Sequence, residues 1–156
     1  MSLNNQIFIG DYVPATNKAL TAFGVGATHN ATAYVNGIDL LDPLRGDGVR
    51  SGVGPEASGI IIYLSLTAVG NGTDTIQLVL QEQDPTSLTW ATIAATLVNP
   101  TTLGLIKLKL KDAIAAAAAT VTGVAVQDKL PRTWRFGVVH SGVSSFTYSI
   151  GVTLYA

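Results

Sequence analysis

The stretch that decides the fold class is Gly59–Val69, with the sequence GIIIYLSLTAV. Apolar or small side chains occupy every second position and would share one face of a strand: Ile60, Ile62, Leu64, Leu66 and Ala68. Ile61 and Tyr63 make the first half apolar on the opposite face as well. A strand that is apolar on both faces is typical of the centre of a sheet or of an interface. The stretch therefore predicts a long strand with at least one face in a hydrophobic core.

Turn residues follow this strand and predict a hairpin. Gly70–Asp74 contains residues that accept positive φ, and Thr75–Gln83 then alternates cleanly as the return strand. A second hairpin is predicted at the C-terminal end, where Thr133–His140 is followed by a turn over Ser141–Ser145. The last strand of that hairpin carries an apolar row: Phe146, Tyr148, Ile150, Val152 and Leu154.

The remaining patterns are shorter. Trp90–Leu97 and Leu105–Lys111 also predict strands, whereas Asp112–Thr120 is compatible with either a short helix or a loop of small residues. Weaker strand patterns lie in the N-terminal third: Gln6–Ile9, Asn17–Phe23 and Ala31–Val35. Roughly six to nine short strands separated by turns indicate an all-β fold. We expect a single-domain β-sandwich, jelly-roll or Ig-like, with its core over residues 56–156 and a loop-rich segment over residues 1–55.

Charge is scarce in this chain. Only 12% of its residues are Asp, Glu, Lys or Arg, and 47% are hydrophobic, whereas about 25% charged residues are usual in soluble domains. This composition favours a subunit that buries part of its surface against partners. The alternative is a monomer covered by Ser, Thr, Asn, Gln and Gly. The net charge of −1 argues against a nucleic-acid partner, which needs a basic footprint.

Targeting and membrane signals are not expected. No apolar run approaches the roughly 20 residues of a membrane span, and Met1–Gln6 lacks the positive region of a signal peptide. We expect synthesis in a bacterial cytoplasm and no membrane partner.

The sequence offers little for catalysis. It contains no cysteine, and its two histidines, His29 and His140, have no partner at a metal-ligand spacing. We interpret both as turn histidines. No nucleophile elbow or carboxylate pair is present. The chain is therefore expected not to be an enzyme and to need no cofactor or metal.

The basic residues suggest an interface. Lys107, Lys109 and Lys111 alternate with Ile106, Leu108 and Leu110, so they share one face of a strand. Such a lysine row is typical of an edge strand that discourages stray pairing. A second interpretation is a positive face that docks on an acidic surface. Four arginines complete the candidate interface set: Arg45, Arg50, Arg132 and Arg135.

The order of these strands, together with Leu130–Arg135 (LPRTWR), His140–Gly142 and Ser145–Gly151, resembles a known group of virion proteins. Over Gly59–Ala156 the chain is similar to the capsid decoration (cement) proteins of tailed bacteriophages. The resemblance implies a structural virion protein on the outer capsid surface that stabilises contacts between capsomers. It implies the major capsid protein and further copies of itself, as a homotrimer, as partners, and it supplies no catalytic residues.

Other functions use the same fold and composition. One alternative is a phage tail or baseplate structural module, or a carbohydrate-binding module. Four aromatic residues are candidate sugar platforms, although aromatics in apolar rows more often belong to the core: Tyr63, Trp90, Trp134 and Tyr148. A small enzyme is the third alternative.

Overall fold

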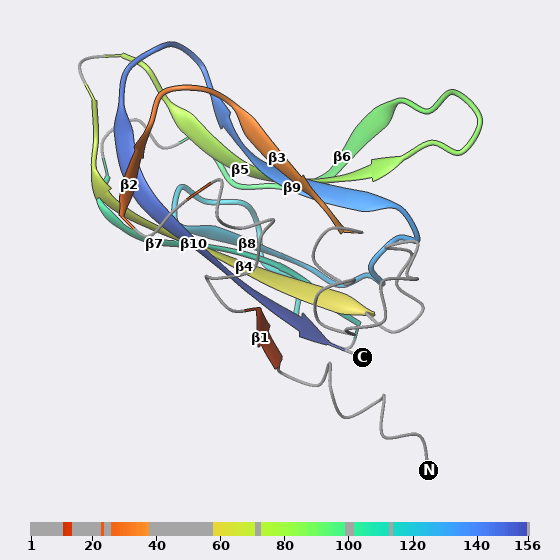
Figure 1. Ribbon diagram of the computed structural model, residues 1–156. Helices are drawn as coiled ribbons and strands as arrows, with labels where there is room; N and C mark the ends of the chain where they lie inside the picture. Colours follow the sequence, from red (N-terminus) through yellow and green to blue (C-terminus); the bar gives the residue numbers. More distant parts are fainter. Residues whose placement is uncertain are drawn as a thin grey trace.

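The computed structural model describes residues 11–13, 23, 26–37, 58–70, 73–98, 102–112 and 114–155. All of its named elements are strands (Figure 1). Their bounds are β1 Asp11–Val13, β2 Ala27–His29, β3 Ala33–Asn36, β4 Gly59–Ala68, β5 Ile76–Gln83, β6 Trp90–Ala95, β7 Gly104–Leu110, β8 Gly123–Val126, β9 Trp134–His140 and β10 Phe146–Tyr155. The described residues contain no helix long and apolar enough to cross a membrane.

The strands form two sheets that pack face to face. Sheet A has the order β1-β10-β4-β7-β8, with β2 also paired to β10, and sheet B has the order β3-β9-β5-β6. All pairs are antiparallel except β7 and β8, which run parallel. The expected all-β sandwich is confirmed, and Figure 1 shows its two layers.

The strand pairs are nested around the β5–β6 turn. β5 pairs with β6, β4 with β7, β3 with β9 and β2 with β10, and successive pairs alternate between the two sheets. A long antiparallel hairpin that is rolled up in this way is a jelly roll. β8 is an addition to that plan, on the open side of β7.

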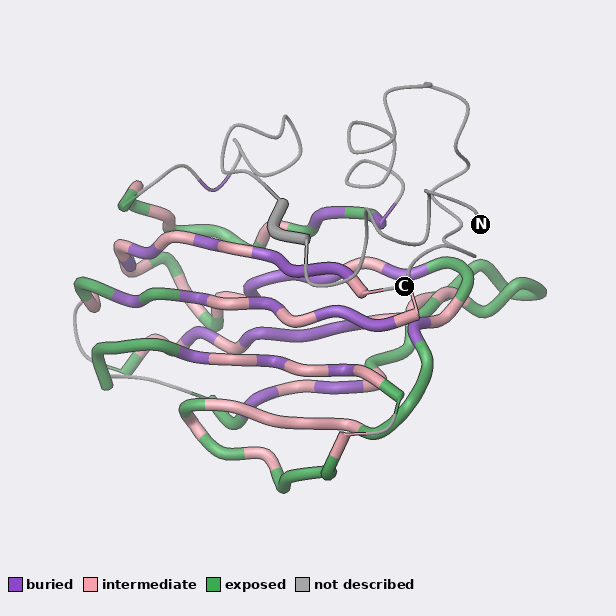
Figure 2. The backbone as a smooth tube through the Cα atoms, turned by 90° about the horizontal axis from the view of Figure 1, so that it is seen from below, coloured by how far each residue is buried: buried purple, intermediate pink, exposed green. Residues whose placement is uncertain are grey.

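Alternation along the strands builds one core between the sheets. The four even-numbered apolar side chains Ile60 to Leu66 of β4 are at most 1% exposed. Facing them from sheet B are Leu78 and Leu80 of β5 and Trp134 and Phe136 of β9. Figure 2 shows buried and less buried residues alternating along several strands, whereas β5 and β9 each have three consecutive buried residues, at 78–80 and 136–138. The periodicity of two that predicted the strands is therefore what places their side chains in the core.

Both predicted hairpins are wrong in their pairing. β4 does not pair with β5, and β9 does not pair with β10, because in each case the chain crosses from one sheet to the other. The two crossings lie together. Thr75 and Ser141 exchange two hydrogen bonds, and the Asp74 carboxylate accepts one from the Ser144 amide at 2.8 Å. A short turn rich in glycine closes a hairpin or spans a sandwich equally well, so turn composition could not distinguish the two.

The lysine-bearing strand is not an edge strand. β7 lies between β4 and β8, so the expectation of a protected edge is wrong. In the segment before β8, the described residues 112 and 114–122 form a loop, and Ala117 pairs with Ala125 across an antiparallel bridge. Thr120 closes this loop through its hydroxyl group, which accepts hydrogen bonds from the amides of Thr122 and Gly123. The short-helix alternative for this segment is thus excluded for these residues.

The N-terminal segment contributes strands to the sandwich. β1 and β2 pair with the same side of β10, and β3 forms one edge of sheet B. The predicted strand over Ala31–Val35 corresponds to β3. The predicted strand at Gln6–Ile9, most of that at Asn17–Phe23 and the glycine-rich loop with Arg45 and Arg50 lie outside the described residues.

Candidate interaction surfaces

The outer face of sheet B carries an ordered guanidinium group. The Arg135 side chain from β9 lies between two aromatic rings, with its Cζ atom 3.9 Å from the ring centre of Tyr34 and 4.3 Å from that of Trp90. Its Nε–H donates to Oε1 of Gln81 at 2.7 Å. We name this group the guanidinium stack. It uses one residue from each of the four strands of sheet B, so the fold itself assembles it.

Close backbone packing supports the guanidinium stack. Gly137 pairs with Tyr34, and the Tyr34 ring lies directly over the position that a Cβ atom on Gly137 would occupy. Val79, the outward-facing partner of Gly137 on β5, is only 4% exposed. The centre of this outer face is therefore packed rather than solvated.

Arg135 has unused hydrogen-bonding capacity. Within the described part of the chain, no partner bonds to its two terminal amino groups, and no carboxylate forms an ion pair with it. It is also the one charged side chain among the described residues that face outward from sheet B. Two rings and a hydrogen bond already hold the guanidinium group. Its two terminal amino groups would therefore lose little further side-chain entropy on binding a carboxylate of a partner.

The lysine row lies on the opposite side of the molecule. Lys107, Lys109 and Lys111 project from the outer face of sheet A, and the alternate side chains of β7 are buried, as predicted. Lys107 lies 5.7 Å from the ring centre of Tyr63, and Lys111 lies 4.0 Å from that of Tyr155.

The structure therefore does not bring the predicted basic residues together. The lysine row and Arg135 face away from each other across the sandwich, and Arg132 is exposed in the connection before β9. Arg45 and Arg50 lie outside the described residues. No single positive face with all seven side chains is present in the described part of the chain.

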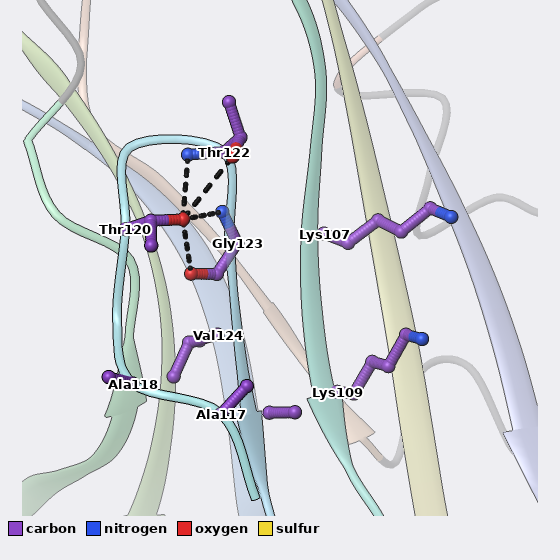
Figure 3. Close-up of a pocket in the computed structure, with 9 residues that line it drawn as sticks. Lys107, Lys109, Ala117, Ala118, Thr120, Thr122, Gly123 and Val124 are labelled. Carbon is purple, nitrogen blue, oxygen red and sulfur yellow. Dashed lines mark hydrogen bonds between the residues drawn. The ribbon is translucent and has the colours of Figure 1, made fainter.

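A shallow hollow of about 280 Å³ lies beside the lysine row. It is lined by parts of β7, β8 and the loop before β8, including Thr120 and Thr122. In Figure 3 the side chains of Lys107 and Lys109 extend away from that loop. The ammonium groups therefore do not converge with the threonine hydroxyls, as an anion site would require.

A histidine–tyrosine cluster joins the two sheets and was missed in the sequence. The His29 ring stacks on Tyr148 with ring centres 4.3 Å apart, and its Nε2 lies 2.6 Å from the Phe23 carbonyl oxygen. Nε2 of His140 lies 3.1 Å from the Tyr148 hydroxyl, while the buried Nδ1 of His140 has no partner in the described structure. Burial, and secondarily the nearby His29, lower the pKa of His140. Burial raises the pKa of Tyr148.

This cluster does not form a metal site. Among the described residues, no group of three or more His, Asp or Glu side chains is arranged to hold a metal ion. Tyr148 is fully buried, and the His140 imidazole bonds to its hydroxyl group. The His140–Tyr148 contact is thus a polar contact within an aromatic cluster. In the sequence, only the aromatic residues in the row of the last strand indicated such a cluster.

The aromatic residues that a carbohydrate-binding module would use are largely occupied. Trp134 and Tyr148 are at most 1% exposed and belong to the core. Trp90 is covered by Arg135, and Tyr63 has Lys107 above its ring. Within the described residues, these four side chains offer no open stacking platform for a sugar.

Comparisons with known proteins found no matching family, no similar curated protein and no similar solved structure.

Proposed function

We propose that this chain is a structural protein that binds the outer surface of a phage capsid and stabilises contacts between its capsomers. The specific assignment comes from the resemblance of Gly59–Ala156 to capsid decoration proteins. The jelly-roll fold is compatible with it, although the same fold also occurs in lectins and cupins and cannot decide alone. The low charge content supports a subunit that works inside an assembly.

The observation that carries this proposal furthest is the guanidinium stack. Tryptophan, tyrosine and arginine are the residues most enriched at the energetic centres of protein interfaces. Here Tyr34, Trp90 and Arg135 occur together on one packed face, on which the described residues carry no other charge. We propose that this face of sheet B docks on the shell and that Arg135 forms a bidentate pair with a carboxylate of the major capsid protein.

The lysine row is the competing docking face. Lys107 pairs with Tyr63 of β4, and Lys109 pairs with Ile61 of the same strand. Within the described residues, no hydrogen bond holds the ammonium groups of the row, although those of Lys107 and Lys111 lie over tyrosine rings. Flexible lysines are strongly hydrated and lose more side-chain freedom on binding than a group that is already held. We therefore assign the lysine row to the solvent side of the bound subunit.

The test is binding to phage heads that lack their decoration protein, taken from a phage whose genome carries this sequence. The purified protein should co-sediment with such heads, reach saturation, and fail to bind heads that are already decorated. Equal binding to both kinds of head, or to neither, would contradict the proposal. Specific binding to phage tails would favour the tail or baseplate alternative.

A further inference from the structure

The turn between β5 and β6 projects from the sandwich. In Figure 1 it stands clear of the two layers, and all six of its residues, Asp84–Thr89, are exposed. The turn carries one large apolar side chain, that of Leu88, which is 65% exposed. A hydrophobic group is therefore held away from the body of the protein, where it contributes little to the core.

The backbone of Leu88 lies in the left-handed region, with a φ of 59°. Among the described residues, Leu88 is the only one other than glycine with a positive φ. Glycine and asparagine adopt this conformation readily, whereas the Cβ atom of a leucine comes too close to the following carbonyl oxygen. Leucine at this position therefore lowers the stability of the turn and also exposes apolar surface. Strain of this kind is typical of positions that serve a function.

Hydrogen bonds hold Leu88 in this conformation. Its amide donates to the Asp84 carbonyl oxygen at 2.9 Å, and its own carbonyl oxygen accepts from Nε2 of Gln83 at 3.0 Å. The Asp84 carboxylate accepts from the Thr86 amide at 2.7 Å and from the Ser87 hydroxyl at 2.9 Å. The turn is thus ordered in the free protein, so Leu88 would lose little backbone entropy on binding a partner.

The turn is continuous with the guanidinium stack. Gln83, whose side chain bonds to Leu88, pairs with Trp90 at the end of the β5–β6 ladder. The Trp90 ring in turn lies 4.3 Å from the Cζ atom of Arg135. An apolar side chain, an aromatic ring and a held cation therefore follow one another from the turn onto sheet B.

We infer that Leu88 inserts into an apolar pocket of the major capsid protein, close to the carboxylate proposed as the partner of Arg135. The inference rests on the proposed function and adds to it a second contact of different chemistry. A projecting, ordered turn with an apolar side chain fits a concave apolar site, and burial of that side chain in the complex is favourable. This gain in the bound state offsets the cost of a left-handed leucine in the free protein.

The test measures the stability and the head binding of Leu88→Asn. Asparagine tolerates a positive φ better than leucine does, so Tm should rise by about 2–4 °C. The same substitution removes the apolar group, so the dissociation constant for undecorated heads should rise at least about tenfold. A residue that serves only the structure of the turn would not change stability and affinity in opposite directions.

Two control variants accompany this test. Val143→Asn also removes an exposed apolar side chain, 84% exposed in the connection between β9 and β10, and should leave head binding unchanged. Leu88→Met keeps an apolar side chain of similar volume and should bind heads more tightly than Leu88→Asn.

Several outcomes would overturn the inference. If the wild type and Leu88→Asn bind undecorated heads equally, this inference fails and the proposed function stands. A lower Tm for Leu88→Asn would assign the leucine to the fold, and a changed molar mass in light scattering would assign it to contacts between copies. A wild-type protein that does not bind undecorated heads would overturn the proposed function, and this inference with it.

Discussion

The two outer faces of the sandwich use their positive charges in different ways. On sheet A, three lysines stand in a row on β7, and within the described residues no hydrogen bond holds their ammonium groups, although those of Lys107 and Lys111 lie over the rings of Tyr63 and Tyr155. On sheet B, a single arginine is fixed by two aromatic rings and a glutamine from three other strands. The number of charges is thus a poor guide to the binding face, because the entropy lost on binding depends on how far a group is already held.

Among the variants that test this comparison, Gly137→Ala should have the largest effect on stability. The added methyl group would overlap the Tyr34 ring and lie 2.7 Å from the Ala33 carbonyl oxygen, so strand β3 has to shift. We expect a loss of about 1–3 kcal/mol in the free energy of unfolding, which corresponds to roughly 3–10 °C in Tm for a chain of this size. Thermal unfolding followed by circular dichroism measures it.

Ser65→Ala on the outer face of sheet A is the control and should change Tm by little, since Ser65 is exposed there. Equal Tm values for the two variants would show that the face of sheet B is not closely packed.

A smaller effect is expected from double-mutant cycles on the two faces. Alanine substitutions of Arg135 and Trp90 should show a coupling of about 0.5–1 kcal/mol, the usual range for an exposed cation–π pair. The corresponding cycle for Lys107 and Tyr63, whose groups are 5.7 Å apart, should give a coupling close to zero. The couplings follow from urea unfolding of the wild type and of the single and double variants. Couplings of equal size would remove the distinction between the faces.

The contact between His140 of sheet B and Tyr148 of sheet A predicts that the stability of the fold depends on pH. Because burial lowers the pKa of His140 below its usual 6.5, the unfolded chain binds more protons than the folded chain once the pH falls below about 6.5. Stability from this group is therefore complete above that pH and is lost as the pH falls further. We expect Tm to decrease between pH 7 and pH 5 in the wild type and to decrease less in His140→Gln.

The interval between pH 5 and pH 7 separates the effect of His140 on stability from the effect of the carboxylates. Hydrogen bonds from Ser144 lower the pKa of Asp74, and hydrogen bonds from Thr86 and Ser87 lower that of Asp84. Stability from these two groups is lost only as the pH falls below about 4. Parallel Tm profiles of the wild type and His140→Gln above pH 5 would show that His140 does not link stability to pH.

The sequence predicted which residues form strands better than it predicted which strands pair with each other. Alternation in Gly59–Val69 and Thr75–Gln83 indicates which side chains face the core, and the structure buries those side chains except Ala68, which is exposed at the end of β4. Alternation says nothing about which strand lies alongside, so both inter-sheet crossings were interpreted as hairpins. The lysine row was visible because its members are two residues apart. The guanidinium stack joins residues 34, 81, 90 and 135, and only the jelly-roll order of sheet B brings them together.

The most direct test of the assignment to sheet B compares two variants in binding to undecorated heads. One is Arg135→Gln, and the other replaces Lys107, Lys109 and Lys111 together by glutamine. We predict that Arg135→Gln raises the dissociation constant at least about tenfold, as expected for the loss of a hydrogen-bonded charge pair, and that the triple variant stays within about twofold of the wild type. Weak binding by the triple variant with normal binding by Arg135→Gln would contradict the account and identify the lysine row as the docking face.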